Sequence, residues 1–142
     1  MSSKRTTLSS APRPPVHLSS SLTISDTAQL TGTHTIEIRG ESVVHPRARL
    51  ESSAGRISVG RRCVVHERAT LGGAPASGKV TVTEVAVTLA DYVTVEVGAV
   101  VEAGETVVGE GTVVGVGARV GAGAVVGKVS PLVLFACWVV GW

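Results

Sequence analysis

Aromatic residues, cysteine and net charge are all scarce in this sequence. The 142 residues include one Phe, one Tyr, two Trp and two Cys, and the formal net charge is +2. So few rings favour a thin interior with no room for large side chains. Two cysteines, Cys63 and Cys137, suggest no disulfide framework. Without a dense Lys/Arg stripe or an aromatic platform, nucleic-acid binding is disfavoured.

A membrane-spanning segment is also lacking. The most apolar stretch, SPLVLFACWVVGW at residues 130–142, is shorter than the roughly 20 residues that a spanning helix needs. Residues 1–15 are rich in Ser, Thr and Pro and are predicted to be a disordered leader, and because no apolar or amphipathic targeting segment is found there, a cytoplasmic location is favoured. We expect one folded domain at 16–130 and an atypical apolar tail at 131–142. The tail either caps the domain or reflects a misread gene model.

Glycine and valine are abundant instead, and they recur with a period of six residues. Residues 107–128 read VVGEGTVVGVGARVGAGAVVGK. A dinucleotide-binding loop fits poorly, because its glycine fingerprint should sit once between a strand and a helix. Each hexad places a branched aliphatic residue first and usually a small residue four places later. Sixteen aliphatic anchors follow this register: Leu18, Ile24, Leu30, Ile38, Val44, Leu50, Val59, Val65, Leu71, Leu89, Val95, Val101, Val108, Val114, Val120 and Val126.

This period is typical of a hexapeptide-repeat β-helix, in which three hexads form one coil. We therefore predict an all-β fold, a single-stranded left-handed parallel β-helix of about five triangular coils. The left hand is general knowledge of hexapeptide proteins and does not follow from the spacing. Breaks in the register at 31–38, 51–58 and 72–88 are expected to bulge out as loops. Leu22, His34 and Glu105 depart from the small residue of the fifth place.

The predicted core comprises anchors of the repeat: Val44, Val59, Val65, Val95, Val108, Val114, Val120 and Val126. Cys63 occupies an inward small-residue place, so burial is favoured over reactivity.

Few residues of this chain can perform chemistry. His45, Arg47 and His66 are predicted to face outward, with the two histidines on neighbouring coils. Such a pair could bind a metal or act as a base, but the sequence offers no third ligand and no Ser/His/Asp arrangement. We therefore favour solvated surface histidines and expect no catalytic residue, cofactor or metal.

The segment VTVEVGAVVEA, residues 93–103, resembles the zinc-binding coil of the gamma-class carbonic anhydrases. The family's ligand positions correspond to Val97 and Glu102, and its remaining histidine falls at or near Gly72. The resemblance implies that this chain keeps the scaffold but lacks the zinc site.

A second resemblance extends over residues 16–128. The run VVHPRARLESSAGRISVG, residues 43–60, is similar to the dynactin subunit 6 family, which is a non-enzymatic relative of those anhydrases. The resemblance implies a cytoplasmic, cytoskeleton-associated adaptor of the dynactin pointed-end complex, which supports dynein-driven transport along microtubules. Its implied partners are a dynactin subunit 5 homologue and other pointed-end subunits, without nucleic acid, membrane insertion or a small-molecule substrate. The family's C-terminal helix has no match in this sequence. The alternative is a hexapeptide-repeat acyltransferase or a gamma-carbonic-anhydrase-like enzyme.

Overall fold

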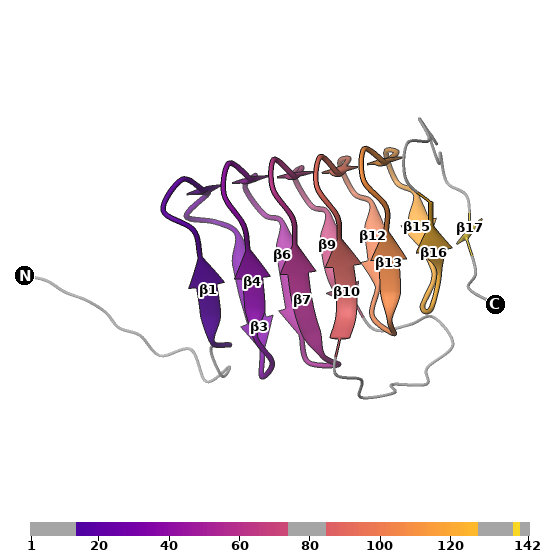
Figure 1. Cartoon of the computed structure of the whole chain (residues 1–142), viewed down its shortest axis with the longest axis horizontal. Coiled ribbons are helices and arrows are strands. Elements are labelled where there is room, and N and C mark those ends of the chain that lie inside the picture. The colour runs from indigo at the N-terminus through magenta and orange to yellow at the C-terminus, as the bar shows by residue number, and fades with distance from the viewer. Residues whose placement is uncertain (1–13, 74–84, 128–137, 140–142) are drawn as a thin grey trace, which may run out of the picture.

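The structure, a computed structural model, describes residues 14–73, 85–127 and 138–139. Its strands form three parallel sheets, which run side by side along the molecule (Figure 1). Sheet A contains β1 (Val16–Leu18), β4 (Ile36–Ile38), β7 (Arg56–Val59), β10 (Val85–Leu89), β13 (Thr106–Val108) and β16 (Val125–Val126). Sheet B contains β2 (Thr23–Ile24), β5 (Val43–Val44), β8 (Val64–Val65), β11 (Thr94–Val95) and β14 (Val113–Val114). Sheet C contains β3 (Gln29–Gly32), β6 (Arg49–Ser52), β9 (Thr70–Gly73), β12 (Val100–Glu102), β15 (Arg119–Val120) and β17 (Trp138–Val139).

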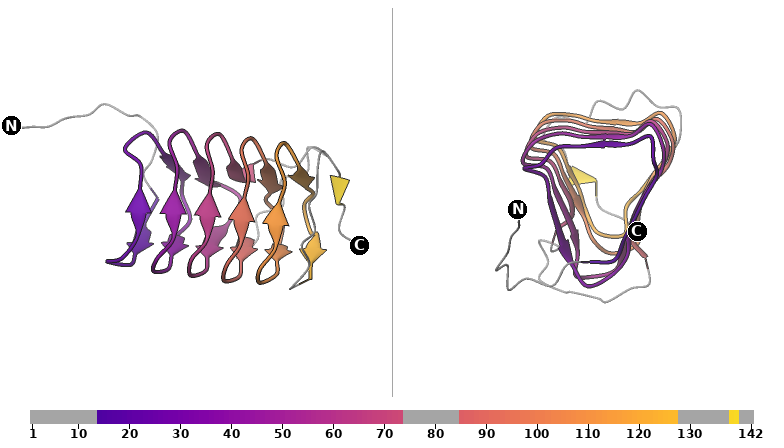
Figure 2. Two further views of the ribbon diagram at one scale, coloured as in Figure 1. Left: turned by 90° about the horizontal axis from the view of Figure 1, so that it is seen from above. Right: turned by 90° about the vertical axis from the view of Figure 1, so that its left-hand side faces the viewer.

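Consecutive strands pass from sheet A to sheet B to sheet C and so complete one coil of a triangular prism (Figure 2). Strands β1 to β15 make five such coils, and β16 begins another. The prediction of an all-β left-handed parallel β-helix is confirmed, and no helix occurs in the described residues. Short strands of β-branched residues suit this fold, because each strand needs only one or two side chains that pack inward. Below, the bends between sheets A and B, B and C, and C and A are called the AB, BC and CA corners.

The hexad anchors fill the prism. The eight predicted core residues are at most 5% exposed. In the first coil, however, Leu18 is 49% exposed, and Ile24 and Leu30 are only partly buried. These three residues face inward like the other anchors, but no described coil lies beyond them.

The small residues of the hexads line the corners from inside. At the BC corner, Ala48, Ala69, Ala99 and Ala118 are fully buried. At the AB corner, Ser42 and Cys63 hold the same kind of place. The Ser42 hydroxyl donates to the carbonyl of Gly60 at 2.8 Å and accepts from the Cys63 amide at 3.2 Å, so this buried polar group is satisfied.

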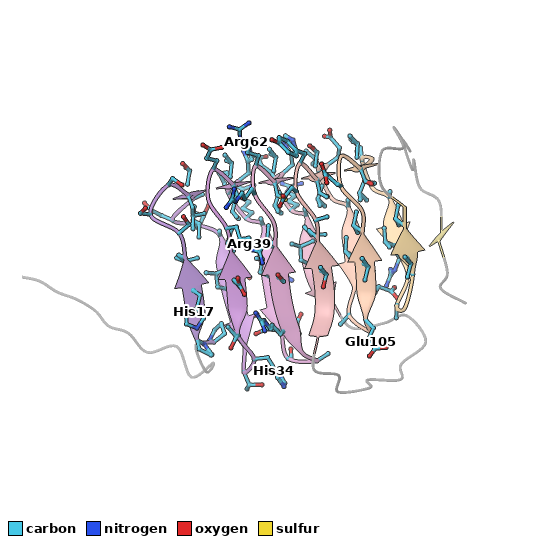
Figure 3. The ribbon with its side chains drawn as sticks, viewed as in Figure 1. His17, His34, Arg39, Arg62 and Glu105 are labelled. Carbon is cyan, nitrogen blue, oxygen red and sulfur yellow. The ribbon has the colours of Figure 1, made fainter. Side chains whose placement is uncertain are left out.

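All three register breaks fall at the CA corner, between β3 and β4, β6 and β7, and β9 and β10. Residues 74–84 of the third break lie outside the described residues. The departures at His34 and Glu105 lie at the same corner, at the lower edge in Figure 3. Glu105 is exposed and has a φ of 60°, while the adjacent Thr106 is fully buried. The seven-residue step from Val101 to Val108 thus moves the inward place by one residue.

The tail expected at 131–142 contributes β17 to sheet C. This strand pairs in parallel with β15, with Val139 opposite Val120. Sheet C therefore continues past the last hexad, and the capping role stays a prediction. The other tail residues, including Cys137, lie outside the described residues.

Candidate functional site

The outward histidines do lie on neighbouring coils. The rings of His45 and His66 are stacked, with centroids 4.8 Å apart and planes inclined by 15°. In the next coil, Glu96 places its Oε2 atom 3.9 Å from Nε2 of His66. These residues follow β5, β8 and β11, so the fold aligns them in a column, here called the histidine column. Among the described residues, no group of three or more His, Cys, Asp or Glu side chains is placed to hold a metal ion.

Two of the three positions matched to carbonic anhydrase ligands lie together at the CA end of sheet C. Gly72 adopts a φ of +81°, and a Cβ there would meet the carbonyl oxygen of Glu51 at 2.2 Å. A histidine at this position would therefore require the backbone to move. Gly73, the next residue, pairs with Glu102 across a register shift between β9 and β12.

Glu102 has a structural role. Its side chain is only 3% exposed, and one carboxylate oxygen accepts a hydrogen bond from Nε of Arg119 in an ion pair. The other oxygen accepts from the backbone amide of Ala122 at 3.3 Å. Charge-assisted bonds of this kind hold the carboxylate in place against the next coil. Val97, the third matched position, is exposed near the BC corner, at the opposite end of sheet C.

A column of complementary side chains follows the AB corner. Arg62 forms an ion pair with Glu41 of the preceding coil. Its guanidinium also lies 5.7 Å from the ring centre of Tyr92 in the following coil and donates to the Tyr92 hydroxyl at 3.3 Å. The hydrogen bond from Arg62 lowers the pKa of the Glu41 carboxyl. All three residues have positive φ angles, which are 60° for Glu41, 53° for Arg62 and 61° for Tyr92.

Beside this column lies an open groove of about 760 Å³, lined from both sheet A and the AB corner. Figure 3 shows His17 and Arg39 on the sheet A face and Arg62 at the corner above them. The charges around the groove are largely engaged with each other. Glu37 contacts Arg56 and Arg39, and the hydrogen bond from Arg56 lowers the pKa of the Glu37 carboxyl.

His34, by contrast, is engaged with the backbone. Its Nδ1 atom lies 2.8 Å from the carbonyl oxygen of Ser52 in the next coil. This contact ties two coils together at the CA corner and leaves His34 a poor candidate for chemistry.

A second, smaller groove lies at the BC corner. Its volume is about 430 Å³, and its lining is Gln29, Arg47, Arg49, Arg68 and Thr70. Gln29, Arg49 and Thr70 are register partners across β3, β6 and β9. Arg47 and Arg68 occupy the same corner position in successive coils, with φ angles of 62° and 59°. Within the part of the chain that the structure describes, none of the three arginines is in an ion pair.

Sequence reasoning placed Arg47 and both histidines on the surface, but it missed the contacts between coils. Arg62, Tyr92, Arg68 and Arg119 were not singled out. The signal that could have found them is the stacking of equivalent corner positions, which lie 21 residues apart for Glu41 and Arg62 and also for Arg47 and Arg68. The additional residues between β9 and β10 lengthen that interval in the following coil.

Comparisons with known proteins include a distant structural likeness. No protein-family model matches the chain, and no curated protein matches it. The resemblance to the dynactin subunit 6 family therefore receives no support from them. A solved structure from Bacillus cereus, described as a "putative acetyltransferase", is similar at 16% sequence identity with a TM-score of 0.33; the match covers 82% of this chain and 73% of that chain.

The stacked parallel strands define the protein as a hexapeptide-repeat-like β-solenoid. In the described residues, no helix is long and apolar enough to cross a membrane.

Proposed function

We propose that this protein is a non-enzymatic adaptor, which joins a larger assembly by stacking the end of its β-helix on a second β-helix subunit. The observation that supports this best is the open first coil. Leu18 is 49% exposed at an inward position, whereas the anchors from the second coil onward are at most 5% exposed. Inward-facing aliphatic residues at the end of a solenoid are shielded from water when a further coil or a cap covers them.

The backbone of the first coil limits which kind of partner can stack on it. Strands β1, β2 and β3 are each the last described strand of their sheet, so three parallel edges face the same direction. An edge strand offers unpaired amide and carbonyl groups for pairing with another chain. A partner that satisfies all three edges at once needs three strands in the same triangular arrangement. The end of another hexapeptide β-helix has that shape.

Together with the resemblance of residues 43–60, this geometry favours the dynactin pointed-end complex, with a subunit 5 homologue as the stacked partner and a cytoplasmic, cytoskeleton-associated location. The structural role of Glu102 favours a scaffold over a carbonic anhydrase, because the one matched position with a metal-binding side chain is bound to Arg119.

The test is co-expression of the full-length chain with a dynactin subunit 5 homologue, followed by pull-down and light scattering. We expect a stoichiometric complex that Leu18→Arg abolishes. Val125→Arg is the matched control, since Val125 is 72% exposed on the outward face of sheet A, and it should retain the complex. Failure of the wild-type chains to associate would refute the proposed partner. A homodimer that Leu18→Arg disrupts would show that the open coil binds a second copy instead.

An acyltransferase is the second candidate, and the histidine column is the observation in its favour. His66 lies beside a carboxylate, and such a histidine can serve as a general base. Acetyl transfer from acetyl-coenzyme A to a panel of amines and sugars would reveal this activity. The acyltransferase hypothesis requires acetyl transfer that His66→Ala abolishes and that Glu96→Gln slows. Stoichiometric zinc that is lost on mutating His45 and His66 would likewise contradict the non-enzymatic proposal.

A further inference from the structure

The groove at the BC corner concentrates positive charge. Three of its five lining residues are arginines: Arg47 and Arg49 from the second coil and Arg68 from the third. Adjacent strands of a sheet are about 4.8 Å apart, so Arg47 and Arg68 stand one such spacing from each other. Like charges at directly neighbouring positions destabilise a sheet. By the same rule Arg47 and Arg68 repel each other, although only weakly, because both side chains are exposed to solvent.

The backbone adds a second cost at the same two positions. Arg47 and Arg68 have φ angles of 62° and 59°, in the left-handed region that non-glycine residues occupy unfavourably. In the two following coils the corner position is Gly98 and then Gly117, with φ angles of 71° and 67°. The fold thus accepts glycine at this corner, and it does not require arginine.

Two other exposed arginines of the chain are used differently. Arg56 and Arg62 each form an ion pair with a glutamate of the neighbouring coil. Within the described residues no carboxylate forms an ion pair with Arg47, Arg49 or Arg68. Glu67 precedes Arg68 in the chain, but it is not part of the groove lining. The guanidinium groups are therefore available to an anion from solution.

From these observations we infer that the groove is a binding site for a small phosphorylated anion with adjacent phosphate groups, such as a diphosphate moiety. Arginine suits phosphate because its planar guanidinium can donate two parallel hydrogen bonds to phosphate oxygens. Arg47 and Arg68 along the corner and Arg49 beside them offer donors to more than one phosphate. The amide of Gln29 and the hydroxyl of Thr70 flank Arg49 and add neutral donors.

The lining also indicates what the site does not recognise. None of its five residues is aromatic, so the groove provides no ring on which a base could stack. Recognition therefore depends on the phosphate groups. The ligand that matches this chemistry is a compact polyanion, whose remainder projects into solvent.

Binding of pyrophosphate to the full-length protein can be measured by calorimetry at low ionic strength. We expect saturable binding that is stronger than binding of inorganic phosphate and that weakens near 0.15 M salt, where charges are screened beyond about 8 Å. Acetate should not compete. ADP should bind about as well as pyrophosphate, because both present a diphosphate.

Single substitutions locate the site. Arg49→Gln and Arg68→Gln should each weaken pyrophosphate binding about tenfold or more, as expected for the loss of a charged hydrogen-bonding partner. The matched control is Arg61→Gln, which removes the same charge from an exposed arginine outside the groove. It should leave the Kd unchanged. The melting temperatures of the variants should stay close to wild type, since neither groove arginine is in an ion pair among the described residues.

Three results would overturn the assignment. These are an absence of saturable binding, an equal loss in Arg61→Gln that points to diffuse surface charge, and tighter, Arg49-dependent binding of a single-stranded oligonucleotide than of pyrophosphate. The last result would identify a nucleic-acid surface. None of these measurements depends on the open first coil, so the anion site and the adaptor proposal can fail separately.

Discussion

The AB and BC corners share a backbone but differ in what they present to solvent. At the AB corner, Glu41, Arg62 and Tyr92 have positive φ angles and contact each other from coil to coil. At the BC corner, Arg47 and Arg68 adopt the same conformation, but both carry a positive charge and both line one groove. The side chains of the first column are complementary, whereas those of the second carry the same charge.

This difference separates what the fold requires from what it leaves open. At both corners the backbone requires a residue with a positive φ angle, such as Arg62 or Arg68. The residue directly after it faces inward and must be small, as Cys63 is at the AB corner and Ala69 at the BC corner. Neither requirement determines which side chain the residue with the positive φ angle presents to solvent. Because residues at a functional surface often oppose stability, the BC corner is the better candidate for ligand recognition.

The inward residues of the corners should give the largest effect. Ala118 is fully buried behind the BC corner, and Ala118→Asp would place a carboxylate where it cannot be solvated. We expect a loss of more than about 3 kcal/mol in the free energy of unfolding, measured by urea denaturation. The control is Val116→Asp at an exposed position two residues earlier, which should change stability by no more than about 0.5 kcal/mol. Similar stabilities for both variants would refute the inward assignment of the hexad.

At the AB corner, the inward residue can be probed through its thiol. Cys63 is fully buried, and burial raises the pKa of its thiol. In a Cys137→Ser background, alkylation by iodoacetamide should be at least about a hundredfold slower than in the denatured chain, because the sulfur reacts only after the coil opens. An exposed reference is Val116→Cys in a chain without the two native cysteines, which should react rapidly. Equal rates for the two thiols would show that the AB corner is open.

The pKa direction at Cys63 also has a consequence for stability. A raised pKa in the folded state means that folding favours the neutral thiol. The folded protein should therefore lose stability as the pH rises above the pKa of the unfolded thiol.

The outward corner residues should give smaller effects of opposite sign. Arg68→Gly relieves the left-handed strain and the repulsion from Arg47, so stability should rise by about 0.5 to 1 kcal/mol. Arg62→Ala removes the ion pair with Glu41 and the contact with Tyr92, so stability should fall slightly, and less so at high salt. Thermal denaturation of both variants in parallel measures the contrast. Changes of the same sign would contradict the distinction between the corners.

The six-residue period was sufficient to predict the fold, because it identifies the residues whose side chains face inward, such as Val59 and Val114. It failed locally at Glu105, since a single inserted residue exchanges inward and outward places. It also could not predict the side-chain contacts between neighbouring coils. The insertion between β9 and β10 separates Arg62 from Tyr92 by 30 residues, whereas Glu41 and Arg62 are 21 residues apart, so only the folded coils show which side chains meet.

The ion pair of the AB corner should also be visible as a small acid dependence of stability. The hydrogen bond from Arg62 lowers the pKa of the Glu41 carboxyl in the folded state. The ion pair therefore stabilises the protein at pH values above the pKa of the unfolded carboxyl, near 4.5. This contribution is lost as the pH falls through the pKa of the folded state. Glu41→Gln should therefore flatten the decline in melting temperature below that pH. Glu67→Gln at the BC corner is the control, because Glu67 forms no ion pair with any described residue, and it should keep the wild-type profile. Identical acid profiles for Glu41→Gln and wild type would mean that the ion pair between Glu41 and Arg62 contributes nothing to holding these coils together, and only the contact of Arg62 with Tyr92 would remain to stabilise the AB corner.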